Sequence, residues 1–281
     1  MTMMTILKGN KGLTLLELIV ALAISALLVA AVYRTFVSQQ KTFTVQEQVV
    51  EMQQSARVSI TRIMDEIRMA GFGNVAMVLP VSVSGRNFPR IINPDTPAVG
   101  ALTVISAMGE GVMITGIPSQ NQITLSKLAD DQGQPLFDTG DRRYLSVGGL
   151  ESYTISAIDT DTKTVTLNGP LKYNHIANRT LVFGIRALTY QVVNEAGMMT
   201  LEWEDNTGRG LQPVADDIEN LQFEYLDAAG NPVANPSDIR RIRVVVTART
   251  DRPDPDLKDG DGHRRRQIAS NIYLRNTIVS P

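Results

Sequence analysis

The chain has no cysteine among its 281 residues. This absence excludes disulfide bonds, a thiol nucleophile and metal sites with cysteine ligands. A fold without disulfide bonds must be stabilised by its own hydrophobic core, and a chain of this length can bury one. Hydrophobic residues make up 43% of the sequence, which is ordinary for a globular protein.

Histidine and net charge are also scarce. The chain has two histidines, His175 and His263, and a formal net charge of −2. We expect both histidines to be surface or loop residues and not ligands. The sequence has no Gly-x-Ser-x-Gly motif, no phosphate-binding loop motif and no His-Glu-x-x-His motif. We therefore predict a protein that is not an enzyme and needs no cofactor. The balanced charge gives no overall preference for nucleic acid or anionic membranes.

A long apolar run lies near the N-terminus. Between Leu18 and Tyr33 the polar groups are Ser25 and the Tyr33 hydroxyl. A helix from Leu13 to Tyr33 is about 30 Å long, which matches the hydrocarbon thickness of a bilayer. We predict that residues 13–36 cross the membrane once.

The apolar run carries one carboxylate, Glu17. A charge inside a membrane segment is costly, so it indicates a function and requires a partner. Cleavage after Gly12 would create an α-amino group on Leu13, four residues before Glu17. The charged residues before Leu13 are Lys8 and Lys11. Because basic residues flank the cytoplasmic end of membrane helices, we place the N-terminus in the cytoplasm and the rest of the chain outside.

Two simpler interpretations of the N-terminus are open. An ordinary secretory signal could be cut after Ala21-Leu22-Ala23 or Val29-Ala30-Ala31. A carboxylate inside the apolar stretch argues against that signal. A plain one-pass anchor explains the length of the run. It does not explain why Gly12 and Glu17 occur at this spacing.

The segment Lys11-Gly12-Leu13 followed by Glu17 resembles the class III signal of type IV pilins and type II secretion pseudopilins. The resemblance implies that residues 1–12 are a leader that prepilin peptidase removes after Gly12. It implies that Leu13 is then N-methylated and that Glu17 acts in assembly by neutralising an N-terminal amine. The first mature residue in this family is usually Phe, and Leu13 differs from that pattern.

The helix is expected to continue to about residue 70, because no Pro or Gly occurs between Leu13 and Ala70. Residues 37–73 form its amphipathic half, which ends at Gly71-Phe72-Gly73-Asn74. Steps of three and four residues place one apolar stripe on this half, which should pack against a β-sheet. The stripe consists of Val45, Val49, Met52, Ala56, Ile60, Ile63, Ile67 and Ala70.

Residues 74–281 are expected to form a β-rich head. Residues 74–100 are rich in Pro, Asn, Gly and Ser and are predicted to be a connecting loop. Asp216–Asn220 is predicted to be a helical turn. The remaining pattern predicts antiparallel strands over Ala101–Ser106, Gly111–Gly116, Gln122–Lys127, Glu151–Ile158, Lys163–Leu167, Thr180–Asn194, Met198–Trp203, Leu221–Leu226, Ile239–Thr250 and Gln267–Asn276.

The C-terminal pattern adds a second resemblance. Asp217–Asp227, Ile239–Val244 and Leu274–Thr277 are similar to PilW-type minor pilins, and pseudopilin J of type II secretion shares the outline. Both resemblances imply a pilin-like α+β fold. In that fold one long N-terminal helix, with a transmembrane first half that also forms the filament core, packs on a C-terminal antiparallel sheet.

An acidic loop is a weak candidate for calcium. Asp254, Asp256, Asp259 and Asp261 supply carboxylates close to two glycines. The spacing does not match an EF-hand, and a polar hairpin loop without metal explains the segment better.

A basic cluster follows the acidic loop. The cluster could bind DNA or phospholipid, and it consists of His263, Arg264, Arg265 and Arg266 together with Arg240, Arg241 and Arg243. A charged edge strand that blocks aggregation is the favoured interpretation, so nucleic acid is not an expected partner.

These patterns together predict a structural minor pilin that helps to initiate and assemble a type IV pilus. Its expected partners are other minor pilins, the major pilin, prepilin peptidase, the inner-membrane assembly platform and, through residues 13–36, the lipid bilayer. Its head would lie in the periplasm of a bacterium and later on the pilus or cell surface. The alternatives are a type II secretion minor pseudopilin and a membrane-anchored adhesin or DNA-binding module.

Overall fold

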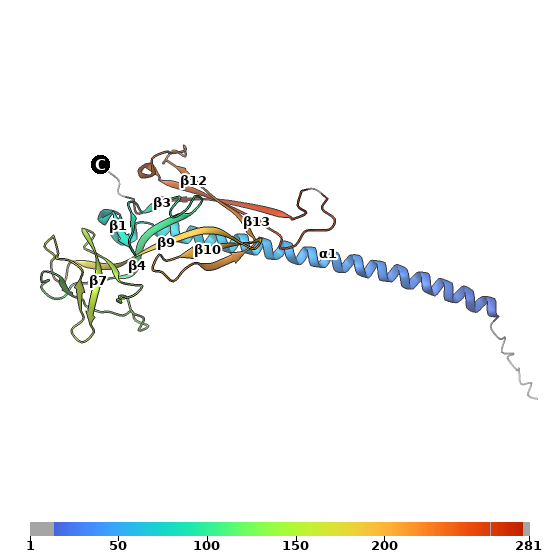
Figure 1. The fold of residues 1–281 in the computed structure, drawn as a ribbon, viewed down its shortest axis with the longest axis horizontal. Helices are drawn as coiled ribbons and strands as arrows, with labels where there is room; N and C mark the ends of the chain where they lie inside the picture. The colour runs from blue at the N-terminus through green and yellow to red at the C-terminus, as the bar shows by residue number, and fades with distance from the viewer. Residues whose placement is uncertain (1–13, 259, 278–281) are drawn as a thin grey trace, which may run out of the picture. The chain divides into compact units, whose positions relative to one another are not determined.

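The computed structural model describes residues 14–258 and 260–277 (Figure 1). By internal contacts the chain forms two compact units, residues 1–50 and 51–281. Helix α1, Leu15–Met69, runs through both units and contains 55 residues. The predicted long helix is therefore confirmed over its described part. Leu13 and Gly12 lie outside the described residues.

Glycine ends α1 as the sequence predicts. Gly71 has φ 74°, a left-handed conformation that favours glycine, and its amide donates to the Ile105 carbonyl over 2.9 Å. A Cβ atom at Gly71 would lie 2.4 Å from the Asn276 carbonyl oxygen. Both the backbone conformation and the close approach of the C-terminal segment therefore require a glycine here.

One face of the second half of α1 is buried in the head. Its buried residues are Met52, Ala56, Ser59, Ile60, Ile63, Glu66 and Ile67. The apolar members lie at the helical spacing that the sequence shows, so the prediction that this stripe packs against a β-sheet is confirmed. Burying these side chains is the main contribution of α1 to the stability of the head.

A polar contact fixes α1 on the sheet at Glu66. The Glu66 carboxylate accepts a hydrogen bond from Arg186 Nη2 over 2.6 Å and lies 3.7 Å from Arg62 Nη2. Arg186 Nε in turn donates to Ser106 Oγ over 3.1 Å. Glu66 is buried, so the Arg186 pair compensates for the loss of hydration of its charge. The sequence offered no local signal for this pair, because its members are 120 residues apart.

The larger sheet of the head has nine antiparallel strands. Its main path runs β11 (Gln212–Asp216), β10 (Met198–Glu204), β9 (Leu181–Glu195), β6 (Tyr144–Val147), β7 (Glu151–Asp159), β8 (Thr164–Leu167) and β5 (Gln122–Thr124). Strand β4 (Leu102–Met113) pairs with β9 and with β3 (Ile92–Pro94). The long strand β9 therefore joins the two parts of this sheet.

Two hydrophobic clusters lie along this sheet. One gathers side chains from β4 to β9, including Ile123, Leu145 and Val165. The other packs Phe88 and Val75 against Ile105. Phe88 belongs to β2 (Arg86–Phe88), which pairs with β1 (Val81–Val83). Val75 belongs to the 3-10 helix η1 (Phe72–Val78).

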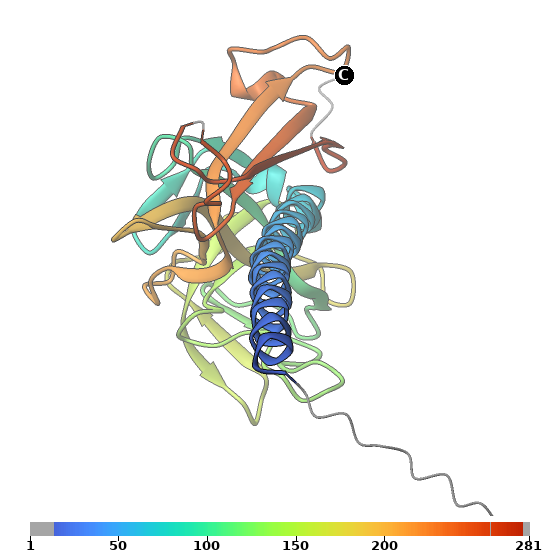
Figure 2. The same ribbon diagram turned by 90° about the vertical axis from the view of Figure 1, so that its right-hand side faces the viewer.

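The smaller sheet contains β12 (Ile218–Leu226), β13 (Arg241–Arg249) and β14 (Arg265–Tyr273), in that order and antiparallel. A short 3-10 helix, η2 (Pro236–Asp238), precedes β13. Both views show this sheet on one side of the head (Figures 1 and 2), and its strand β12 contacts β9 and β10 of the larger sheet. The three C-terminal strands and the two predicted hairpins, β7–β8 and β9–β10, are confirmed.

Several local predictions were wrong. Residues 74–100 are not one loop, because η1, β1, β2 and β3 occupy much of this segment. Prolines and glycines there separate short elements. Asp216–Asn220 is not a helical turn: β11 ends at Asp216, Asp217 has φ 63°, and β12 begins at Ile218.

The prediction of two separate strands within residues 101–116 was also wrong. The two predicted runs belong to one strand, β4, which has a bulge between Met108 and Val112 that interrupts the alternation. Strands β6 and β11 were not predicted. Strand β6 is buried on both faces and therefore shows no polar alternation.

Candidate functional site: the N-terminal membrane segment

Thr14 and Glu17 form a reciprocal cap at the start of α1. Glu17 Oε2 accepts hydrogen bonds from the Thr14 amide over 2.9 Å and from Thr14 Oγ1 over 3.0 Å. The Glu17 amide donates to Thr14 Oγ1 over 3.2 Å. This is a capping box, which satisfies amides that the first turn of a helix leaves without partners. The sequence signal, Thr-x-x-Glu, was present but was not used in the prediction.

The cap occupies one carboxylate oxygen of Glu17. Both bonds from Thr14 reach Oε2, so Oε1 has no hydrogen-bond partner among the described residues. A carboxylate oxygen can accept further donors. The geometry therefore orients Glu17 at the helix N-terminus and leaves one oxygen for another group. The predicted cleavage and methylation residues, Gly12 and Leu13, lie outside the described residues.

Apolar side chains surround the first half of α1. Leu15, Leu22 and Leu27 are 78%, 68% and 71% exposed. Two hydroxyls in this half bond to the helix itself: Ser25 Oγ donates to the Ala21 carbonyl and Thr35 Oγ1 to the Ala31 carbonyl. Polar groups satisfied inside the helix are tolerated in a bilayer. Among the described residues, α1 is the one helix long and apolar enough to cross a membrane.

Residues 7–33 match the prokaryotic N-terminal methylation motif. The match covers residues 7–12 of the predicted leader, the predicted cut at Gly12 and most of the apolar run. It supports a type IV pilin-like protein, either a pilin or a pseudopilin, that prepilin peptidase processes. With the apolar helix it supports anchoring in a membrane. This motif points to a structural protein. Neither the curated proteins nor the solved structures include a match to the chain.

The acidic loop is held by arginines in the described part of the chain. Asp254 is buried, and its Oδ2 accepts a hydrogen bond from Arg264 Nε over 2.7 Å and forms an ion pair with Arg264 Nη2 at 2.6 Å. The Asp256 amide and Arg264 lower the pKa of Asp254, so this carboxyl stays ionised. The described residues contain no group of three His, Cys, Asp or Glu that could hold a metal. Asp259 lies outside the described residues, and a calcium site stays a prediction.

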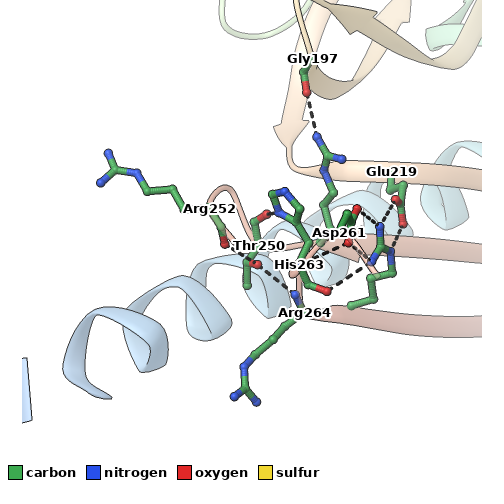
Figure 3. A network of polar contacts seen from close by, with 9 residues as sticks. Gly197, Glu219, Thr250, Arg252, Asp261, His263 and Arg264 are labelled. Carbon is green, nitrogen blue, oxygen red and sulfur yellow. Dashed lines mark hydrogen bonds and ion pairs between the residues drawn. The ribbon is translucent and has the colours of Figure 1, made fainter. Parts of the chain in front are cut away.

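Carboxylates accompany the basic cluster (Figure 3). Arg265 donates to both oxygens of Glu219, over 2.7 and 2.8 Å, and to both oxygens of Asp261, over 2.8 and 2.6 Å. Arg265 thereby lowers the pKa of Glu219 and of Asp261. Arg243 pairs with Glu224. This arrangement resembles a charge-balanced edge strand more than a free basic patch.

Other members of the basic cluster also have partners. The Arg241 guanidinium lies 4.3 Å from the centroid of the Tyr273 ring, and Arg240 Nη1 donates to the Ser237 carbonyl. Arg264 contacts Asp254. Strand β14, which carries residues 265 and 266, is at the edge of its sheet. Arg265 and Arg266 thus lie on a strand whose free edge would otherwise invite pairing with another chain.

The histidines differ in their surroundings. His263 Nδ1 donates to the Thr250 carbonyl over 2.6 Å in the acidic loop (Figure 3). His175 lies in a loop, as predicted, but its side chain is 1% exposed and contacts Glu151. No sequence signal links these two residues, which are 24 positions apart and meet only in the folded head.

Proposed function

We propose that the chain is a PilW-type minor pilin, a structural protein that helps to initiate and assemble a type IV pilus. The observation that carries this proposal is the methylation motif over residues 7–33, joined to a helix with exposed apolar side chains. Prepilin peptidase cuts after Gly12, and Leu13 becomes the methylated N-terminus. The cut removes Lys8 and Lys11 and leaves the apolar helix at the start of the mature chain.

Glu17 directs docking between subunits. In a membrane or filament core, an N-terminal amine and a carboxylate are each costly alone and much less costly together. The capping box with Thr14 holds the Glu17 carboxylate at the start of α1 and leaves Oε1 for such an amine. The amine is that of an adjacent subunit or of the chain itself.

The partners and the location follow from this assignment. Residues 13–36 lie in the inner membrane of a bacterium, with the N-terminus in the cytoplasm and the head in the periplasm. Other minor pilins, the major pilin and the assembly platform contact the mature chain. The head reaches the pilus or the cell surface when the filament grows.

A type II secretion minor pseudopilin is the second candidate. The same methylation motif supports it, because pilins and pseudopilins share this signal. A deletion strain separates the two: loss of surface pili with normal secretion supports the minor pilin, and the reverse supports the pseudopilin. A DNA-binding module is less favoured because carboxylates accompany the basic cluster, and it would require salt-dependent DNA binding by the head.

The decisive test of the docking role uses Glu17→Ala in the native strain. We expect normal membrane insertion, because an apolar helix without this charge inserts at least as well. Affinity for other minor pilins should fall about 100-fold to 10,000-fold, since the partner amine loses its counter-charge in a low-dielectric contact. Co-purification of minor pilins and a count of surface pili, at equal membrane abundance, measure the effect.

The matched control is Glu47→Ala, which removes an exposed glutamate from the same helix. It should leave co-purification and pilus number unchanged. Glu17→Gln should be intermediate, because its amide oxygen can accept a hydrogen bond from the partner amine but carries no charge. If Glu17→Ala keeps wild-type levels of both readouts, the carboxylate does not direct assembly and a simple membrane anchor is the better account.

A further inference from the structure

A cavity of about 300 Å³ opens in the head between η1, the β6–β7 turn and the loop that precedes β9. Asn74, Asn174 and Arg179 supply polar side chains, and Leu150 and Ile176 belong to its apolar part. Leu150 and Ile176 are 46% and 60% exposed. Exposed apolar groups that border convergent polar groups are typical of small-molecule sites.

A buried dyad underlies this cavity. His175 lines it, and His175 Nε2 lies 2.6 Å from Glu151 Oε1; the two side chains are 1% and 6% exposed. Glu151 Oε2 also accepts hydrogen bonds from the Tyr153 hydroxyl over 2.5 Å and the Lys172 amide over 2.9 Å. Burial raises the pKa of Glu151, but the donated hydrogen bonds outweigh burial and lower it overall. Glu151 is therefore a carboxylate at neutral pH.

The carboxylate fixes the orientation of the imidazole. Because an ionised carboxylate only accepts hydrogen bonds, His175 Nε2 carries the proton between the two residues. Nδ1 of His175 has no hydrogen-bond partner among the described residues. A Cβ atom at Gly148, which also lines the cavity, would lie 3.3 Å from Nδ1. Nδ1 thus faces space that a glycine leaves free.

The atoms around His175 leave one acceptor toward the cavity. With the Nε2 proton directed to Glu151, Nδ1 has a lone pair that can accept a hydrogen bond from a hydroxyl group. Burial and Glu151 raise the pKa of Tyr153, so this hydroxyl stays neutral. Arg179 adds a positive charge to the same cavity. The other charged group on this loop, Lys172, meets Glu151 through its backbone amide.

We propose that this cavity binds a sugar ring that carries a carboxylate, such as a hexuronic acid unit. The guanidinium of Arg179 fits the carboxylate, and His175 Nδ1 with the amides of Asn74 and Asn174 fits ring hydroxyls. The apolar side chains of the cavity suit the C–H face of a ring. The size of the cavity, at the lower end for small-molecule sites, suits one ring. This assignment is independent of whether the chain serves a pilus or a secretion system.

The test is titration of the full mature chain in detergent micelles with glucuronate, monitored by ligand-observed NMR. Glucose and acetate are the two reference ligands, since each carries part of the proposed chemistry. We expect saturable binding of glucuronate, with glucose and acetate each at least about 10-fold weaker because each lacks one set of contacts.

Arg179→Gln is the main variant, because Arg179 is exposed and its loss should not affect folding. It should weaken glucuronate binding about 5-fold to 10-fold. Arg252→Gln, on the acidic loop with a side chain 77% exposed, is the matched control and should bind like wild type. His175→Gln keeps a donor for Glu151 but removes the Nδ1 acceptor, so it should weaken glucuronate binding about 5-fold, with thermal unfolding recorded alongside.

Three results would overturn the proposal. The first is no saturable binding of glucuronate at tens of millimolar. The second is equal affinity for glucose or acetate, which would remove the need for a ring that bears a carboxylate. The third is unchanged affinity in Arg179→Gln. A stable His175→Gln protein that binds with wild-type affinity would exclude the histidine from the site.

Discussion

The two halves of α1 contain similar apolar side chains and present them in opposite ways. In the first half they surround the helix and are exposed, as at Leu27, which is 71% exposed. In the second half they form a stripe on one face, and Ile63 and Ile67 are fully buried against the head. The distribution of apolar residues around a helix, and not their number, therefore determines what it packs against. An exposed apolar surface of this extent marks a membrane or protein contact.

Each half also carries one glutamate at its apolar surface. Glu66 forms ion pairs within the head, with Arg186 at 2.6 Å and with Arg62 at 3.7 Å. Glu17 is held by Thr14 and has no cation among the described residues. The apolar face of the second half is thus already covered by the head. We propose that the apolar surface of the first half contacts the membrane or other subunits of the filament.

The largest expected contrast concerns apolar truncation in the two halves. Ile63→Ala removes a fully buried side chain and should lower the free energy of unfolding of the head by about 3–4 kcal/mol. Ile24→Ala, at a position 54% exposed, should leave that free energy unchanged. Urea unfolding in detergent, followed by the fluorescence of the single tryptophan, Trp203, measures both. Equal losses in the two variants would contradict the division of α1.

A smaller contrast concerns two adjacent acidic residues. Glu66→Ala leaves Arg186 without its partner in a largely buried site and should cost about 3 kcal/mol. Asp65→Ala removes an exposed pair with Arg68 and should cost less than about 0.5 kcal/mol. The same unfolding experiment applies. If Asp65→Ala is as harmful as Glu66→Ala, the polar contact under α1 is not what fixes the helix on the head.

The smallest expected effect is the pH dependence that one ion pair gives to the stability of the head. Arg265 lowers the pKa of Glu219 in the folded head, so the folded state binds fewer protons than the unfolded state. Its contribution is complete above the unfolded pKa of about 4.3 and is lost as pH falls through the folded pKa. Glu219→Gln should therefore cost up to about 1 kcal/mol at pH 7 and almost nothing near pH 3.

Denaturant titrations of wild type and Glu219→Gln at pH 7 and pH 3 give this difference. Glu224→Gln, in a more exposed pair with Arg243, serves as the control and should change stability less. A loss from Glu219→Gln that is the same at both pH values would show that ionisation of Glu219 does not contribute.

Periodic segments could be predicted from the sequence, and contacts between distant segments could not. The apolar stripe from Met52 to Ile67 predicts the buried face of α1, and the alternation in β12 and β13 predicts the buried face of these strands. The β4 bulge and the fully buried β6 break or hide that alternation. The loop prediction for residues 74–100 failed because Pro and Gly there separate short elements, and composition alone cannot locate these elements.

The candidate site shows the same limit. The spacing of Gly12, Leu13 and Glu17 is local, and the methylation motif covers these residues. The cap formed by Thr14 also depends on residues close in sequence, and the capping-box pattern Thr-x-x-Glu would have predicted it. The dyad of His175 and Glu151 and the pair of Glu66 and Arg186 depend on the folded chain, because the partners come from different elements.

The central claim is that the first half of α1 is the processed, methylated N-terminus of a pilin-like subunit. Mass spectrometry of the N-terminal peptide from native membranes tests it most directly. We predict a chain that begins at Leu13 with one added methyl group, and no such peptide in a Gly12→Val strain. An N-terminus beyond Ala23, or an intact chain from Met1, would contradict the claim.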